Sequence, residues 1–291
     1  MNLDPQIKQK ITQQTASEII SINPIAGGCT SDAFKLEMKS GENYFLKLNY
    51  FVTNNMFIKE ANGLNELKKP AVIRIPAVIL FENSFILMEY IETGVKTKNF
   101  FEDFGRKFAE LHKFKGHSYG FYEDNFIGSN IQRNIPDDNE NNDWVNFFYT
   151  KRLLTQFTLA EKNDYVTPEL TYGILALEKK IYKILGGSEE HPALLHGDLW
   201  SRNYIIDEKG SPVLIDPAVY YGHREADLAM TKLFGGFKPD FYSAYNECYP
   251  LLQGYEYRED IYKLYHVLNH LNLFGKAYYS QAIRIINSYI K

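Results

Sequence analysis

The sequence of 291 residues contains only two cysteines, Cys29 and Cys248, far apart in the chain. Two isolated cysteines exclude a disulfide framework and a clustered cysteine metal site, and they fit a reducing cytoplasm. Long hydrophobic runs are missing as well. The longest, such as 77–81, are strand-sized and fall far short of the ~20 residues that span a bilayer. We therefore expect a soluble protein without membrane association.

The chain also lacks an excess of positive charge and an export signal. Its formal net charge is -4, from 32 Lys and Arg against 36 Asp and Glu. A nucleic-acid partner is not expected, because it would require a concentrated cationic face. Residues 1–14 have no apolar stretch of the kind that a signal peptide needs. What remains, 45% hydrophobic and 23% charged residues, is typical of a cytoplasmic globular protein with a sizeable core.

The first third of the chain is dominated by strand-like alternation. Strands are predicted at 18–25, 32–38, 43–48, 77–81 and 84–88. A short helix is predicted at 5–15, and a second at about 54–68, capped by Asn54 or Asn55 and closed by Pro70. Five strands and the second helix would form a small lobe.

Helical patterns follow a short connection at 90–96. Helices are predicted at 99–114, 143–160 and 168–185, with several more beyond 225. The polar segment 115–142 is too long for a routine connection, so we expect a functional or disordered loop there, with 137–143 solvated. The predicted organisation is an N-terminal nucleotide-binding lobe at 1–89, a hinge at 90–96 and a C-terminal catalytic and substrate-binding lobe at 97–291.

The segment His196-Gly197-Asp198-Leu199 carries the strongest chemical signal. Asn203, five positions after Asp198, gives the spacing of a kinase catalytic loop, in which Asp accepts a hydroxyl proton and Asn holds Mg²⁺. A predicted hairpin over 204–215 would deliver Asp216 to a second metal-binding position. Either aspartate alone could simply cap a turn. Together they indicate phosphoryl transfer, which needs an oriented nucleophile and cations on the phosphates.

Lys47 is a lone cation within the apolar strand 44–48, where burying its charge is costly unless it is paired. Glu60 on the following helix is the expected partner, since kinases use a Lys–Glu pair to hold the lysine against ATP phosphates. The alternative is a solvated edge-strand lysine.

The loop Gly27-Gly28-Cys29-Thr30-Ser31 is no Walker A motif and could be a plain hairpin turn. Its place between two strands ahead of Lys47 favours a second interpretation, in which backbone N–H groups and the Thr30 or Ser31 hydroxyl cover ATP phosphates.

Three further residues are candidates for contact with an acceptor substrate. Trp200 follows Asp198 closely and could offer its indole face to a sugar ring or simply pack. His266 and His270 lie four apart on a predicted helix, a spacing that also suits zinc, but no third ligand accompanies them. We take His270 and its neighbour Asn269 as candidate substrate contacts.

Several of these segments together resemble the fructosamine kinase (ketosamine-3-kinase) family. The resemblance rests on Leu195-His196-Gly197-Asp198-Leu199-Trp200-Ser201, Leu214-Ile215-Asp216-Pro217-Ala218, Tyr220–Met230 and Leu264–Gly275, and it loosely covers the chain from the glycine loop onward. It implies an α+β, protein-kinase-like fold with two lobes. The N-terminal lobe would be a small antiparallel sheet with one helix, and the C-terminal lobe would be larger and mostly helical.

The resemblance implies an ATP-dependent kinase that uses Mg²⁺ and acts on the O3 hydroxyl of a ketoamine. The ketoamine would be a small molecule or a glycated protein, attached through a lysine side chain or free amine. The phosphorylated adduct then eliminates and frees the amine, which makes the enzyme a deglycating repair enzyme. Bacterial-type members look better suited to ribulosamines and erythrulosamines than to fructosamines.

Carried over by motif position, the roles implied are these: Asp198 as base, Asn203 and Asp216 as Mg²⁺ ligands, Lys47 with Glu60 on the phosphates, Glu89 and Ile91 as hinge backbone for adenine, and Asp227 as a carboxylate that braces the catalytic loop. Arg202 stands where the family usually has glycine. Its cation beside Asn203 could alter the loop, and so metal affinity, or meet an acidic group.

Family members often carry a redox-sensitive cysteine in the glycine loop, which makes Cys29 a candidate link between two subunits. The protein would then be a monomer or a redox-linked homodimer. A small buried residue is the alternative interpretation of Cys29.

Two other functions remain open. One is a small-molecule kinase of the same fold that acts on an aminoglycoside, choline or a sugar, because fold does not fix substrate, and His-Gly-Asp alone fits such kinases. The other is a nucleotide-binding redox switch with weak catalysis, suggested by Cys29 and Arg202. The intact Lys47, Asp198, Asn203 and Asp216 argue for activity.

Overall fold

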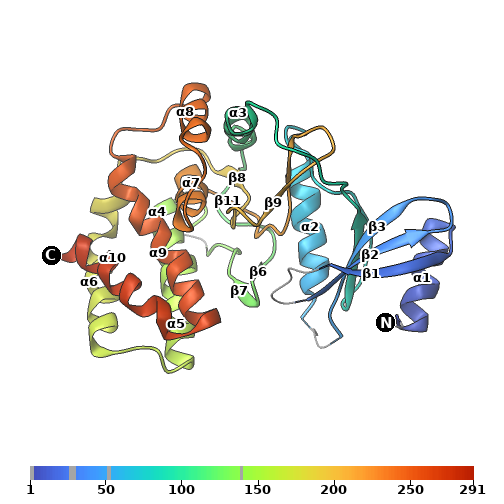
Figure 1. Ribbon diagram of the computed structural model, residues 1–291. Coiled ribbons are helices and arrows are strands. Elements are labelled where there is room, and N and C mark those ends of the chain that lie inside the picture. Colours follow the sequence, from blue (N-terminus) through green and yellow to red (C-terminus); the bar gives the residue numbers. More distant parts are fainter. Residues whose placement is uncertain (1–2, 26–30, 51–53, 138–139) are drawn as a thin grey trace.

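The computed structural model describes residues 3–25, 31–50, 54–137 and 140–291. Two lobes lie side by side in Figure 1, the N-terminal sheet with its helices on one side and a larger, mainly helical C-terminal lobe on the other. The two chain ends lie at opposite ends of the molecule. Within the described residues, no helix is both long and apolar enough to cross a membrane.

The N-terminal lobe is built on a five-stranded antiparallel sheet in the order β1-β2-β3-β5-β4. Its elements are α1 (Pro5–Thr15), β1 (Ile19–Ile25), β2 (Asp32–Met38), β3 (Asn43–Leu48), α2 (Met56–Lys68), β4 (Val78–Phe81) and β5 (Phe85–Glu89). The strands and helices are those that the sequence predicts, within one or two residues at each end. The helix α2 begins after Asn55, but the Asn55 side chain makes no capping hydrogen bond.

Alternation along the strands gives the sheet two different faces. Leu46 and Leu48 of β3 point to one face, where they pack with Ile7 and Ile11 of α1. The predicted helix at 5–15 is therefore α1 and packs on the sheet, so the lobe carries two helices where the resemblance implied one. Because side chains alternate along a strand, Lys47 points to the opposite face, toward α2. The strand pattern thus decides the side from which the lysine can find a partner.

The C-terminal lobe packs long helices around short strand pairs. Its elements are α3 (Phe100–His112), β6 (Asn125–Ile127), β7 (Asn130–Gln132), α4 (Trp144–Phe147), the π-helix η1 (Phe148–Leu154), α5 (Thr155–Lys162), α6 (Pro168–Leu185), β8 (Ala193–Leu195), β9 (Tyr204–Ile206), β10 (Pro212–Leu214), β11 (Tyr220–Gly222), α7 (Arg224–Leu233), α8 (Pro239–Cys248), α9 (Tyr255–Phe274), the 3-10 helix η2 (Lys276–Tyr278) and α10 (Tyr279–Ile290). Each strand pair is antiparallel.

The single helix predicted at 143–160 is a composite. Its centre, η1, has π-helical hydrogen bonding between two α-helical segments. Arg152 of η1 is fully buried, where it donates to Asn134 Oδ1 at 2.8 Å and lies 3.9 Å from the Tyr220 ring centre. Periodicity alone does not separate these helix types, because the π segment differs by one residue per turn.

The segment 115–142 is ordered over its described part, in contrast to the long loop that the sequence suggests. It contains the β6–β7 hairpin, and the Asn125 and Gln132 amides are buried and donate to the backbone carbonyls of Val219 and Ala218. Satisfied amides tie the segment beneath the catalytic residues. The expectation that 137–143 is solvated is also wrong for Glu140, which is 2% exposed and accepts from the Asp137 amide.

Candidate active site

Lys47 lies between two carboxylates from different lobes. Its Nζ lies 2.6 Å from Glu60 Oε1 of α2 and also pairs with Asp216 Oδ1 beyond β10. The expected Lys47–Glu60 pair is therefore present, and the edge-strand alternative is wrong. Burial alone would lower the pKa of Lys47, but the charges of Asp216 and Glu60 outweigh it and raise the pKa above its ordinary value. Burial raises the pKa of Glu60.

Asp198 lies at the start of the loop between β8 and β9. Asn203 Nδ2 donates to the Asp198 carbonyl at 2.7 Å and to its Oδ2 at 3.1 Å. Among the described residues, no Lys, Arg or His forms an ion pair with Asp198. Burial, followed by the negative charge of Asp216, raises the pKa of Asp198 well above its ordinary value. The site thus holds a carboxylate that is poised to take up a proton.

Asp198 precedes the β9–β10 hairpin and Asp216 follows it, so the hairpin brings the two carboxylates near each other. Its backbone has a left-handed φ of 54°, which costs energy for a residue with a Cβ and is often found at functional sites. Only one of its carboxylate oxygens pairs with Lys47. Asn203 uses Nδ2 as a donor to Asp198, and within the described residues no side chain or backbone group donates to its Oδ1, which can therefore act as a ligand.

These oxygens fit a hard cation such as Mg²⁺. A carboxylate and an amide oxygen are ligands that Mg²⁺ accepts, and the mutual repulsion of Asp198 and Asp216 would be relieved by a cation between them. In the described part of the chain, no group of three or more His, Cys, Asp or Glu could hold a metal by itself. Mg²⁺ in kinases is completed by substrate phosphates and water, so this incomplete set is the expected one.

Asp227 of α7 lies behind the catalytic loop. It accepts hydrogen bonds from the backbone amides of His196 and Gly197 at 2.7 and 2.8 Å, and His112 Nε2 lies 3.3 Å away. Burial alone would raise the pKa of Asp227, but these donors lower it. Gly197 has a φ of +81°, and a Cβ there would lie 1.9 Å from the Ala218 carbonyl oxygen. Glycine is therefore required at this turn.

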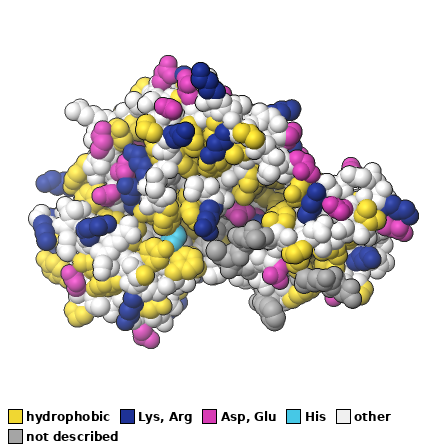
Figure 2. Space-filling model, in the orientation of Figure 1, with side chains coloured by type: hydrophobic (Ala, Val, Ile, Leu, Met, Phe, Trp, Pro, Cys, Tyr) yellow, Lys and Arg dark blue, Asp and Glu magenta, His cyan; other side chains and the backbone are white. Residues whose placement is uncertain are grey.

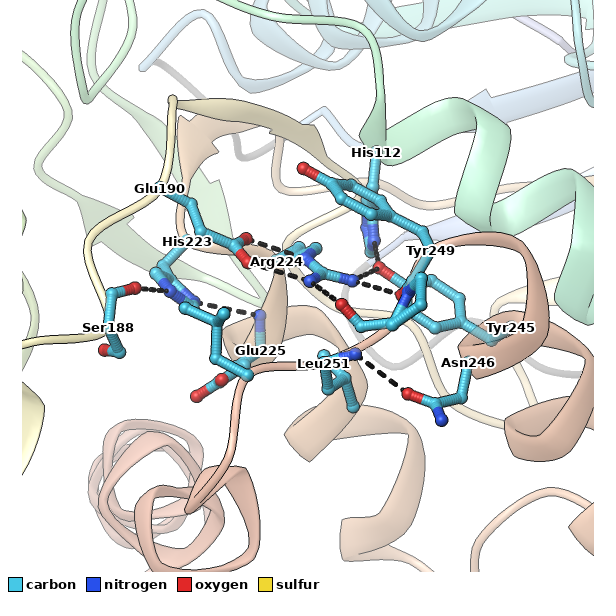
Figure 3. Close-up of polar contacts among 12 residues, drawn as sticks. His112, Ser188, Glu190, His223, Arg224, Glu225, Tyr245, Asn246, Tyr249 and Leu251 are labelled. Carbon is cyan, nitrogen blue, oxygen red and sulfur yellow. Dashed lines mark hydrogen bonds and ion pairs between the residues drawn. The ribbon is translucent and has the colours of Figure 1, made fainter.

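Arg224 anchors the segment that carries Asp227, and the sequence analysis gave it no role. Figure 3 shows its guanidinium between Glu190 and the chain around Tyr249. Both Glu190 carboxylate oxygens accept at 2.7 Å, and the carbonyls of Tyr249 and Pro250 accept at 2.6 Å. This bidentate pair is almost completely buried. Arg224 belongs to the segment Tyr220–Met230, and its role there is to hold the fold together through Glu190.

Arg74, just before β4, links the end of β5 to the β9–β10 turn of the C-terminal lobe. Its guanidinium contacts Glu89 Oε1 at 2.6 Å, Glu208 at 2.9 Å and Asp207 at 3.3 Å. Ile91, just beyond β5, is buried, and its backbone forms no hydrogen bond within the described residues. A free backbone donor and acceptor beside a fixed strand end suit an adenine edge.

The helix α2 is also held from the C-terminal lobe. Glu123, just before β6, accepts from Lys59 Nζ at 3.1 Å and from Asn62 Nδ2 at 2.8 Å. Both residues flank Glu60 on the helix. Further along, Tyr221 donates to Glu66 at 2.8 Å. These contacts fix Glu60 in its position beside Lys47, and no short-range sequence pattern could have identified them.

Aromatic side chains form a wall beside the catalytic loop. The Trp200 ring lies 5.2 Å from Phe234, which lies 4.8 Å from His270. Trp200 and His270 are half-buried, so the wall is partly open to solvent. Figure 2 shows a hollow between the lobes in which a histidine, hydrophobic side chains and charged side chains of both signs are exposed. We call Trp200, Phe234 and His270 the acceptor wall.

The histidines of α9 are neutral at physiological pH. Burial lowers the pKa of His270, whose Nδ1 lies 2.8 Å from the His266 carbonyl and donates to it, leaving Nε2 as an acceptor. Burial lowers the pKa of His266 to about 3.

Asn269 does not line the hollow. It is 1% exposed, and its Oδ1 accepts from Asn130 and Gln156, so its assignment as a substrate contact is corrected to a structural one.

Most of the predicted phosphate loop, namely Gly27, Gly28, Cys29 and Thr30, lies outside the described residues. Ser31 is half-buried and directly precedes β2.

Comparisons with known proteins agree with this arrangement. The family model for fructosamine kinase matches residues 3–291. A chloroplastic protein-ribulosamine 3-kinase from Arabidopsis thaliana is 38% identical over 100% of this chain and 89% of its own length. A probable ketoamine kinase from Enterococcus faecium is 37% identical over 91% of this chain and 94% of its own length.

Solved structures extend the likeness to three dimensions. A crystal structure from Haemophilus somnus, named for fructosamine-3-kinase, superposes with a TM-score of 0.86 at 28% identity, over 98% of this chain and 97% of that one. A choline kinase from Streptococcus pneumoniae gives a TM-score of 0.66 at 18% identity over 98% of both chains, which shows the shared protein-kinase-like fold. The chain belongs to the fructosamine kinase family of ATP-dependent kinases.

Proposed function

We propose that this protein is an ATP-dependent ketosamine 3-kinase that phosphorylates ribulosamine or fructosamine adducts and so initiates deglycation. The observation that carries the proposal is Asp198, a half-buried carboxylate with a raised pKa and no cationic partner in the described chain, held by Asn203 beside the acceptor wall. A base of this kind must lie within hydrogen-bond reach of the reacting hydroxyl.

In the proposed reaction, Asp198 accepts the proton of the O3 hydroxyl as the O3–phosphorus bond forms. The bond between the γ-phosphorus and the oxygen that bridges to the β-phosphate breaks, and ADP leaves with that electron pair. The phosphate introduced at O3 is a better leaving group than hydroxide. Its elimination then frees the amine, which would be a lysine side chain or a free amine.

We propose the following roles for the other site residues. Lys47, fixed by Glu60, would hold the α- and β-phosphates, and Asn203 with Asp216 would hold Mg²⁺, which neutralises phosphate charge when bound. The backbone at Glu89 and Ile91 would receive adenine. Gly27, Gly28, Cys29, Thr30 and Ser31 would cover the phosphates. Asp227 acts behind them as a positioning residue.

For the acceptor, we propose that Trp200 and His270 contact the sugar part of the ketoamine. An indole face packs against the apolar side of a sugar, and the neutral His270 can accept a hydroxyl hydrogen bond through Nε2. A preference for ribulosamines over fructosamines is supported by the plant relatives, which are named protein-ribulosamine 3-kinases.

The test is ADP release with ribulosyl-lysine, fructosyl-lysine and kanamycin, measured for wild type and Asp198→Asn. We expect turnover on the ketoamines, fastest with ribulosyl-lysine, and none on kanamycin. Loss of the base in Asp198→Asn should slow turnover by about 10²- to 10⁴-fold. Glu82→Gln, in an exposed ion pair with Lys10 of α1, is the matched control and should keep full activity.

Two results would contradict the proposal. If neither ketoamine were phosphorylated in an Asp198-dependent way, the assignment would be overturned. Turnover on kanamycin alone would favour an aminoglycoside kinase.

A redox-linked dimer through Cys29 is a separate proposal, and it rests on the family resemblance of the glycine loop. Cys248, on α8, is the other cysteine and is a free thiol. Non-reducing electrophoresis after oxidation should give a dimer band for wild type and for Cys248→Ala, but not for Cys29→Ala. A monomer in all three samples would contradict a disulfide-linked dimer through Cys29.

A further inference from the structure

Arg202 is an exposed cation within the catalytic loop. It lies between Asp198 and Asn203 in the sequence, and its guanidinium lies 5.5 Å from the centre of the Trp200 ring. Because Trp200 also packs against Phe234, the guanidinium stands at the edge of the acceptor wall. A stacked arginine loses little further freedom when it binds a ligand, since its planar group is already oriented.

This guanidinium forms no ion pair and no hydrogen bond with the described residues. Most of the other arginines have such partners: Arg74, Arg106, Arg133, Arg224 and Arg258 form ion pairs, and Arg152 donates to Asn134 and to carbonyls. The glycine loop at 26–30 contains no carboxylate in its sequence. The five N–H donors of the Arg202 guanidinium are therefore available to a bound ligand.

The position of Arg202 favours the acceptor over the nucleotide. It lies 5.5 Å from the Trp200 ring of the acceptor wall, whereas the expected Mg²⁺ ligands face other groups: Asn203 donates to Asp198, and Asp216 pairs with Lys47. Guanidinium groups match carboxylate and phosphate geometry through two parallel hydrogen bonds.

We propose that Arg202 makes this protein select ketoamine acceptors that carry an anionic group, either a phosphate on the sugar or a carboxylate on the amine. The inference rests on the proposed ketosamine kinase function and concerns the acceptor end of the same site. It makes Arg202 a specificity-determining residue, while Asp198 remains the base.

The test compares acceptors in pairs that differ only in the anion. One pair is the ribose 5-phosphate ketoamine of a blocked lysine and the ribose ketoamine of the same lysine. The other is ribulosyl-glycine and ribulosyl-glycinamide. The measured quantity is the ratio of kcat/KM for the anionic acceptor to kcat/KM for its neutral counterpart. The ratio is used because a change beside Asn203 alters turnover on every acceptor.

For wild type, we expect a ratio of roughly tenfold to a hundredfold in at least one pair, the range of a hydrogen bond to a charged group. The pair that shows it identifies the phosphate or the carboxylate as the anion. Arg202→Gln and Arg202→Gly should bring the ratio close to one, and Arg202→Lys should keep part of it. Higher salt should lower the wild-type ratio. Arg284→Gln, which changes an exposed arginine of α10, is the matched control and should keep the full ratio.

Three results would overturn the inference. Equal kcat/KM of wild type for both members of each pair would leave the ketosamine kinase function intact and remove only the role of Arg202. A loss by one common factor on all acceptors in the Arg202 variants, or a raised KM for ATP, would assign Arg202 to the nucleotide end. If wild type phosphorylated no ketoamine at all, the proposed function would fall together with this inference.

Discussion

Two groups of charged residues in this protein are built on opposite principles. Around α7, buried charges are matched: Arg224 has Glu190, and Arg258 forms a two-point pair with Glu225 at 2.6 and 2.8 Å. In the cleft, one ammonium, Lys47, pairs with both Glu60 and Asp216, while Asp198 has no cationic partner among the described residues. The first group satisfies itself and stabilises the fold. The second is left short of positive charge, which a metal ion would supply.

The difference shows how stability and function divide between the C-terminal lobe around α7 and the cleft between the lobes. A buried ion pair that is complete resists change, because removing one partner leaves an uncompensated charge. A buried carboxylate that lacks a cation is a cost to the fold, and such costs gather at functional sites. Four substitutions would break or sharpen this contrast.

The largest effect on stability is expected for Arg224→Met. Glu190 would be left without its bidentate partner, and the carbonyls of Tyr249 and Pro250 would lose their donors. We expect a loss of about 3–5 kcal/mol in the free energy of unfolding, measured by urea denaturation. The control is Arg106→Met, whose ion pairs are exposed to water, and its unfolding midpoint should hardly move. Equal effects of the two variants would contradict the contrast.

Asp227→Asn should come next, with an effect on both stability and activity. The backbone amides of His196 and Gly197 would share one amide oxygen, and the NH₂ group of the asparagine cannot accept from them. We expect the free energy of unfolding to fall by about 1–3 kcal/mol. The pKa of Asp227 is lowered, so its contribution is present above the unfolded pKa and is lost as pH falls through the folded pKa. The difference from wild type should therefore shrink in acid. Circular dichroism melting across pH would check this, and a constant difference would argue against it.

Asp198→Asn should raise stability while it removes activity. The pKa of Asp198 is raised, so its effect on stability is most favourable in acid and is lost as pH rises through the folded pKa. At neutral pH without ligands, we expect the variant to gain about 1 kcal/mol in unfolding free energy. Saturating Mg²⁺ and ATP should reverse the order, because ligands that bind the folded state stabilise it. If Asp198→Asn were less stable than wild type without ligands, the ionised Asp198 carboxylate would not destabilise the folded state.

The smallest effect is expected for Glu123→Gln. Weakening its contacts with Lys59 and Asn62 should loosen α2 and so the position of Glu60 beside Lys47. KM for ATP should rise by about two- to fivefold, the equivalent of a partly exposed ion pair, with little change in melting temperature. Glu82→Gln again serves as control. An unchanged KM for ATP would mean that α2 needs no support from Glu123.

The sequence by itself determined the parts whose information is local. The helix α6 runs over the predicted 168–185, because Thr167 caps it, Pro168 opens it and its apolar residues recur at helical spacing. Asp198, Asn203 and Asp216 could be found because their spacing along the chain is set by one loop and one hairpin. Lys47 could be paired with Glu60 because a charge in an apolar strand requires a partner on the next helix.

The tertiary structure alone decided the contacts between residues far apart in the chain. Arg74 with Asp207, Lys59 with Glu123 and Arg224 with Glu190 depend on how separate elements pack, which no local period records. The same holds for the burial of Asn269, which the sequence analysis took as a substrate contact, and for the β6–β7 hairpin within 115–142, where it expected a functional or a disordered loop. Local patterns fix the element and the residue type, whereas packing decides which side chains are enclosed and which remain free to act.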